Sequence, residues 1–332
     1  MKLRKILVNL FVGLVFVGTL GITSQLASAD TTDSSSSSAV QTKALSKPYV
    51  VYGAGLASED KDDIATALGV KSNYESLTAT GNDYATYLNS AGTTDASMIS
   101  SVSLAPADPG SGVKVNIEKF NGQNNISQVT SQQYAMVATM AGVKDVIITV
   151  TADKSVSGES ALTGVYKALA ADGLSLNAEN TQAANDVLDA TQPAINSNSD
   201  DTSYPGKLMS AVGDVSAKLA KQRQSDNNLA TKADIKQMLE EALADHDITS
   251  KTPSSSINNI VIALSNVQKA PVSTTKTYIN NVTNVANDLK SSIGDKMASL
   301  KDFANSADAK KAQNFLQSLW QKITDFFNSL FN

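Results

Sequence analysis

The sequence VKDVIITVTA, at residues 143–152, consists mostly of β-branched side chains, and SGESALTGVYKALAADG follows it at residues 157–173. β-Branched side chains pack well on a pleated sheet. In the second segment the apolar residues recur three and four positions apart, which places them on one face of a helix. We therefore predict a buried strand followed by a helix. This pair indicates that the N-terminal half of the chain contains both strands and helices.

A second strand and helix are predicted upstream of this pair. YVVYGAGL at residues 49–56 has the composition of a strand, and SEDKDDIATALGV at residues 58–70 has that of a helix. Ser58 is a preferred residue at a helix start, acids fill the first turn, and Gly69 is typical of a helix end. This half of the chain therefore begins with a strand, a turn and a helix.

The segments between these two pairs predict a hairpin and a further helix. ISSVSLAP at residues 99–106 and GVKVNIEKF at residues 112–120 alternate with period two around a Pro-Gly turn, which is typical of a hairpin. TSQQYAMVATMAG at residues 130–142 has helical periodicity. We expect an α+β or α/β domain with a mixed sheet at residues 48–173.

Only helical periodicity remains after Gly173. The predicted helical segments are 178–190, 206–224, 231–245, 253–268, 273–303 and 305–331. We expect an all-α helical domain at residues 174–304, followed by a separate C-terminal helix at residues 305–332.

The N-terminus has the features of a secretory signal peptide. Lys2, Arg4 and Lys5 precede an apolar run, and Ala-Ser-Ala at residues 27–29 is a small-residue cleavage site. We expect export and removal of residues 1–29; the alternative is an uncleaved transmembrane anchor. Residues 30–47 are rich in Ser and Thr, and we expect a flexible leader there.

The composition narrows the classes of function. The sequence has no cysteine, which removes disulfides, thiolate metal sites and lipoprotein attachment, and suits an exported protein of a Gram-positive bacterium. Its net charge is −5 before the basic signal peptide is removed. Nucleic acid is not expected as a partner, because phosphate binding needs a clustered basic surface.

The only histidine, His246, lies among acids at a predicted helix end, where we expect a solvated or C-capping role.

Three short segments imitate the boxes of penicillin-recognising enzymes: Ser58 to Lys61, Ser225-Asp226-Asn227 and Lys251-Thr252-Pro253. The third segment lacks its glycine and starts a predicted helix rather than a strand. We expect Ser58 to cap a helix, and we assign no catalytic residue.

Gly53 and Gly55 lie between a strand and a helix, as in phosphate-binding loops, but Ser58 stands where a dinucleotide fingerprint needs a third glycine. The acids near residue 60 match no calcium-binding loop. We therefore assign no cofactor-binding or metal residue. Paired carboxylates, as in glycosidases, form in space rather than in sequence, and that alternative stays open.

The C-terminal segment FLQSLWQKITDFFNSLFN, residues 315–332, is fully amphipathic when drawn as a helix. The expected membrane or partner contacts on its apolar face are Phe315, Leu319, Trp320, Ile323, Phe326, Phe327, Leu330 and Phe331. The apolar surface of these aromatic side chains is larger than the apolar patches that soluble monomers usually leave exposed. The alternatives are packing on the helical domain, contact with an envelope protein or a membrane surface, and self-association.

Residues 141–164, AGVKDVIITVTADKSVSGESALTG, resemble the YpuA-like family of exported Gram-positive proteins, a domain of unknown function. The resemblance covers nearly all of the mature chain and is most specific at Val156–Glu159 and Ala161–Gly164. It implies an extracellular or cell-envelope protein without established catalytic residues or cofactor. Within this string we expect structural roles: Gly158 and Gly164 permit tight turns and a close approach of helix and sheet, and Ser157 caps the helix.

We therefore expect an exported protein that acts in the cell envelope or outside the cell and is not an enzyme. The competing hypothesis is a cell-envelope hydrolase that acts on peptidoglycan or peptide through residues that the sequence does not identify. Such an enzyme would have a cleft with perturbed carboxylates.

Overall fold

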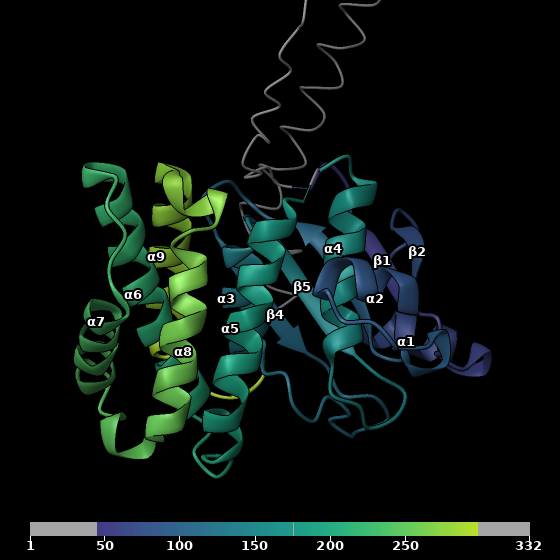
Figure 1. The fold of residues 1–332 in the computed structure, drawn as a ribbon. Coiled ribbons are helices and arrows are strands. Elements are labelled where there is room, and N and C mark those ends of the chain that lie inside the picture. The colour runs from purple at the N-terminus through teal and green to yellow at the C-terminus, as the bar shows by residue number, and fades with distance from the viewer. Residues whose placement is uncertain (1–44, 175, 298–332) are drawn as a thin grey trace, which may run out of the picture. The chain divides into compact units, whose positions relative to one another are not determined.

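The computed structural model describes residues 45–174 and 176–297. The strands within this range are β1 (Tyr49–Gly53), β2 (Glu75–Ala79), β3 (Ser101–Pro106), β4 (Val113–Ile117) and β5 (Val146–Thr151). The helices between them are α1 (Lys61–Ala67), α2 (Gly81–Leu88) and α3 (Ser131–Met140), and α4 (Glu159–Ala171) follows β5. The rest of the described chain forms α5 (Ala178–Asn196), α6 (Tyr204–Asp226), α7 (Lys232–Asp245), α8 (Ser254–Val267) and α9 (Lys276–Lys290). This order confirms an α+β half followed by a helical half (Figure 1).

The five strands form one mixed sheet in the order β2-β1-β3-β5-β4. β1 is parallel to β2 and antiparallel to β3, and β5 is antiparallel to β3 and parallel to β4. The predicted hairpin is therefore wrong, because β5 lies between β3 and β4. Every residue of β5 is buried, as an interior strand requires. The loop after β3 crosses the end of β5, where the Asp145 carboxylate accepts the N–H groups of Gly110 and Gly112 at 2.9 and 3.1 Å.

Helices cover both faces of this sheet. α4 packs closely on one face, because a Cβ atom on Gly164 would lie 2.7 Å from Val102 Cγ1 and 3.2 Å from Val51 Cβ. On the other face, α1 buries Ile64 against Val50 and Tyr52. Gly164 therefore has the expected structural role of allowing close helix–sheet contact.

The sequence signals missed β2 and α2. β2 is a polar edge strand with three of its five residues exposed, so it has little of the β-branched character of β5. α2 begins at a capping box in which Thr80 and Asp83 exchange side-chain and backbone hydrogen bonds. A capped polar helix of eight residues gives a weak periodicity signal.

The helix predicted at residues 273–303 is interrupted within the described part. α9 ends at Lys290, and the chain returns to the free edge of β4. There the Ile117 N–H donates to the Asp295 carbonyl at 2.8 Å, and the Met297 N–H donates to the Val115 carbonyl at 3.0 Å. This short antiparallel segment covers the edge strand.

Buried side chains from both halves form one contiguous cluster, in which α3 contacts β4, α5 and α9. The division at residues 173/174 stays a prediction. The expected signal peptide, most of the leader, residues 298–304 and the C-terminal helix lie outside the described residues. Within the described ranges, no helix is both long and apolar enough to cross a membrane.

Candidate functional site

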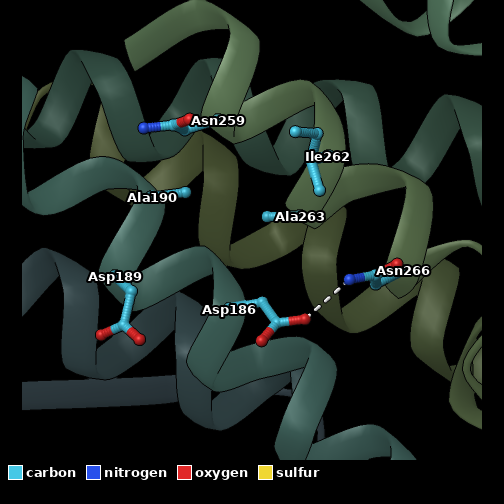
Figure 2. Close-up of a pocket in the computed structure, with 7 residues that line it drawn as sticks. All are labelled: Asp186, Asp189, Ala190, Asn259, Ile262, Ala263 and Asn266. Carbon is cyan, nitrogen blue, oxygen red and sulfur yellow. Dashed lines mark hydrogen bonds between the residues drawn. The ribbon is translucent and has the colours of Figure 1, made fainter. Parts of the chain in front are cut away.

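A groove of about 360 Å³ lies between α5 and α8 (Figure 2). Helical spacing places its lining on one face of each helix. The lining residues are Asp186, Asp189 and Ala190 of α5 and Asn259, Ile262, Ala263 and Asn266 of α8. Two carboxylates, two amides and three aliphatic side chains thus surround the groove.

The sequence of α8 explains why this face stays open. Ile257, Ile260, Val261 and Leu264 are buried in the core. Ile262 lies outside that buried face and is 48% exposed although it is apolar. On the facing helix, Asn177 caps α5 by accepting the N–H groups of Glu179 and Asn180. Two regular, well-packed helices therefore form the walls of the groove.

Hydrogen bonds fix one end of the groove. Asp186 Oδ2 accepts from Asn266 Nδ2 at 2.7 Å, which links α5 to α8, and Asp186 Oδ1 accepts from Gln182 Nε2 at 2.9 Å. Figure 2 shows the amide nitrogen of Asn266 directed at Asp186. The side-chain oxygen of Asn266 is left as an acceptor.

Asp189 has an unfavourable electrostatic environment. It makes no hydrogen bond or ion pair with any residue of the described chain, although its side chain reaches solvent at the rim of the groove. Partial burial, followed by the charges of Glu159 and Asp186, raises the pKa of its carboxyl group. Perturbed carboxyl groups in clefts are concentrated at functional sites.

A second, smaller pocket of about 190 Å³ lies at the start of α4. Tyr84 donates a hydrogen bond to Glu159 there, and burial followed by this bond raises the pKa of the Tyr84 hydroxyl. Ser160 Oγ is buried 2.5 Å from Ser100 Oγ. The specific part of the string at Val156–Glu159 therefore lines a pocket as well as starting a helix.

The expected tight turn at Gly158 is present, with a φ of 109°. A Cβ atom there would lie 2.6 Å from the Tyr134 hydroxyl oxygen. Gly158, not Ser157, is the N-cap residue of α4, but Ser157 Oγ accepts the N–H of Glu159, the first residue of the helix, at 3.5 Å.

The two glycines that suggested a phosphate loop serve close packing instead. A Cβ atom on Gly53 would lie 2.1 Å from the Met98 carbonyl oxygen, and one on Gly55 would lie 2.4 Å from that of Ala96. The neighbouring backbone fills the space next to both residues. The loop therefore packs closely against residues 95–99.

The boxes that imitate penicillin-recognising enzymes have separate local partners. Ser58 donates to Glu59 rather than to Lys61, whose ammonium group lies over the Tyr52 ring. Asp60, not Ser58, precedes α1, so the expected cap is wrong. Lys251 pairs with Asp201 at 2.6 Å.

His246 is the C-cap residue of α7, as one of the two expected roles requires. It is 4% exposed rather than solvated, and its Nε2 lies 3.1 Å from Asp214 Oδ2. In residues 45–174 and 176–297, no group of three or more His, Asp or Glu side chains is arranged to hold a metal ion.

The eight contact residues predicted at positions 315–331 lie outside the described residues, so that prediction is untested. Sequence reasoning missed the groove. The sequence pattern that could have indicated it is a set of residues outside the apolar faces of α5 and α8. They are the polar residues at positions 186, 189, 259 and 266, together with the isoleucine at position 262. Only tertiary packing shows that these two faces meet.

The comparisons with known proteins give a family but no activity. A family model described as "Protein of unknown function (DUF1002)" matches residues 52–285. The curated "Uncharacterized protein YpuA" of Bacillus subtilis (strain 168) is 27% identical over 294 residues, which cover 87% of this chain and 89% of that protein. No solved structure matches the chain.

Proposed function

Because the chain belongs to the DUF1002 family, whose description assigns no activity, we propose a function from its own residues and geometry. The protein is exported and acts in the cell envelope or outside the cell as a non-enzymatic binding protein. Its ligand occupies the groove between α5 and α8. The resemblance seen at residues 141–164 is confirmed by the family match, whereas export and binding are proposals.

The chemistry of the groove supports binding rather than catalysis. Among the seven described residues that line it, none carries a hydroxyl, thiol, imidazole or amine, so a catalytic role would depend on the two carboxylates alone. Carboxylates, amides and aliphatic side chains are suited to recognition by charge, hydrogen bonding and apolar contact. This lining is the observation that carries the proposal.

Export rests on the first 29 residues of the sequence. N-terminal sequencing of the protein recovered from medium and envelope fractions tests it. We expect the mature chain to begin at Asp30. Recovery of the protein in the cytoplasmic fraction with its first 29 residues intact would contradict export.

The C-terminal segment is proposed to make a contact outside the described part. Within the described part of the chain, the exposed large apolar side chains are those of Leu229, Ile262 and Ile293, which lie on separate segments. The apolar face of residues 315–331 would cover more surface than these scattered side chains offer. A membrane surface, an envelope protein or a second copy would cover it.

Truncation after Asn314 tests this contact. We expect the truncated protein to shift from the envelope fraction to the medium, and light scattering to report any loss of self-association. Identical distribution, mass and stability of the two forms would contradict a role of the C-terminal segment.

The second candidate function is a cell-envelope hydrolase, and Asp189 is the observation that favours it. A carboxyl group with a raised pKa beside a second carboxylate is the arrangement used by general acids in glycan hydrolysis. Incubation with purified cell-wall material separates the candidates. Fragment release that disappears in Asp189→Asn favours hydrolysis, and the absence of release favours binding.

A further inference from the structure

We propose that the groove between α5 and α8 binds a primary ammonium group carried on a short aliphatic stem, which is the chemistry of a lysine side chain. This inference rests on the proposed binding function and specifies its ligand class. It draws on the shape of the groove, its hydrogen-bond acceptors and its exposed apolar side chain.

The acceptors in the groove outnumber the donors. The carboxylate of Asp189 has no hydrogen-bond or ion-pair partner in the described chain, and the charges acting on it, those of Glu159 and Asp186, are negative. Asn266 uses its amide nitrogen on Asp186, and Figure 2 shows its oxygen on the side away from Asp186, so the carboxylates are the acceptors on which the proposal rests. An ammonium group supplies three donors and a positive charge.

The charges of the lining exclude an anionic ligand. The lining has two carboxylates and no cationic side chain, so an anion would meet repulsion there. A neutral ligand would leave Asp189 without a compensating charge. A cation is therefore the ligand that relieves the electrostatic stress in the groove.

The apolar lining provides contact for the stem. Ala190 and Ala263 are buried at the base of the groove, and Ile262 projects from α8 between Asn259 and Asn266 (Figure 2). Almost half of Ile262 remains in contact with solvent. A chain of methylene groups along Ile262 would bury this surface while its charged end reaches the carboxylates.

The size of the groove limits the ligand. A volume of about 360 Å³ is at the small end of the range for ligand sites. It suits one amino-acid side chain rather than a folded partner domain. A lysine-type side chain combines this size with the stem and the charge that the lining requires.

The test uses the complete mature chain and two probes that differ only in the terminal group. Nα-Acetyl-lysine N-methylamide carries the ammonium group, and Nα-acetyl-norleucine N-methylamide has a similar stem without charge. Each probe is titrated while NMR follows the Ile262 methyl groups and the Asn266 side-chain amide. The variants are Asp189→Asn and, as the matched control, Asp200→Asn, which removes an exposed carboxylate outside the groove.

We expect saturable shifts with the lysine probe, at least tenfold weaker binding of the norleucine probe, and at least a tenfold loss in Asp189→Asn. The Asp200→Asn variant should bind like the wild type, and added salt should weaken binding. Unperturbed backbone resonances in Asp189→Asn would show that its fold is intact.

Two outcomes would overturn the assignment. Equal binding of both probes would reject an ammonium ligand but leave the groove as a binding site, so the proposed function would survive. If neither probe shifted the NMR signals of Ile262 and Asn266, the result would reject binding of both the ammonium group and the aliphatic stem in the groove. The proposed function itself fails separately, if the exported protein releases fragments from cell-wall material.

Discussion

Asn266 on α8 donates its side-chain N–H to Asp186 on α5 across 2.7 Å, and the two residues are 80 positions apart in the sequence. This bond holds the two walls of the groove together at one end. It also fixes which atom of Asn266 remains available to a ligand. The shape and the acceptor pattern of the groove thus depend on one amide orientation.

Breaking this bond should cost stability. Asn266→Ala is expected to lower the free energy of unfolding by about 1 kcal/mol. A hydrogen bond to a charged group contributes more to stability than one between neutral groups, but this bond is only partly buried. Urea unfolding of Asn266→Ala, Asp186→Ala and the double variant gives the coupling energy. Strict additivity of the two single effects would contradict the link.

Asp189→Asn should stabilise the protein at neutral pH. The raised pKa means that the folded state favours the protonated carboxyl group, so stability falls as the pH rises from the ordinary pKa through the folded pKa, and the full cost is present above the folded pKa. Below the ordinary pKa of 3.8, both states are protonated and the cost disappears. Because the side chain is partly solvated, we expect a gain of less than about 1 kcal/mol.

Thermal unfolding at pH 7 and pH 3 tests this prediction, with Asp200→Asn as the control for loss of a negative charge. The melting temperature of Asp189→Asn should exceed that of the wild type only at pH 7. A decrease at pH 7, or the same gain in the control, would show that Asp189 is not strained by its neighbours.

Gly164→Ala should be destabilising because α4 lies so close to the sheet. The new methyl group would meet Val102 Cγ1 at 2.7 Å, and overpacking of this kind costs about 1–3 kcal/mol. Combining it with Val102→Ala removes the closest clash, so the two losses should be less than additive. Additive losses in denaturant unfolding would argue against this contact.

The strands and helices that follow from side-chain periodicity alone were predictable. β5 and α4 have strong signals, so VKDVIITVTA and the helix after it are found where expected. The failed hairpin has a different cause. The Pro-Gly turn marks a chain reversal but does not specify the neighbour of each strand, and the fully buried β5 takes the place beside β3.

The candidate site was less predictable, because it exists only where two helices meet. Asp186 and Asn266 each look like ordinary solvent-facing residues on an amphipathic helix. Their contact depends on the packing of α5 on α8, which no local pattern encodes. The same holds for His246, whose burial against Asp214 of α6 arises from tertiary packing.

A cysteine pair should trap the segment that follows α9 on the sheet. Asn116 and Lys296 face each other between two flanking backbone hydrogen bonds, which makes them a non-hydrogen-bonded antiparallel pair. Such pairs have Cα atoms about 4.5 Å apart, within the range of a disulfide. The natural sequence has no cysteine to compete.

In Asn116→Cys/Lys296→Cys we expect quantitative oxidation and a stability gain of about 2–4 kcal/mol over the reduced form of the same variant. Non-reducing electrophoresis and denaturant unfolding measure both. Failure to oxidise in the folded state would mean that residues 295–297 do not lie along β4.

The most direct test of the binding account is an NMR pH titration of the Asp189 side-chain carboxyl group, with and without Nα-acetyl-lysine N-methylamide. Without the probe, the account predicts a pKa above the ordinary value of 3.8. Saturating probe should lower it, because an ammonium group favours the ionised carboxylate. A pKa at or below the ordinary value that does not respond to the probe would contradict an ammonium-binding groove.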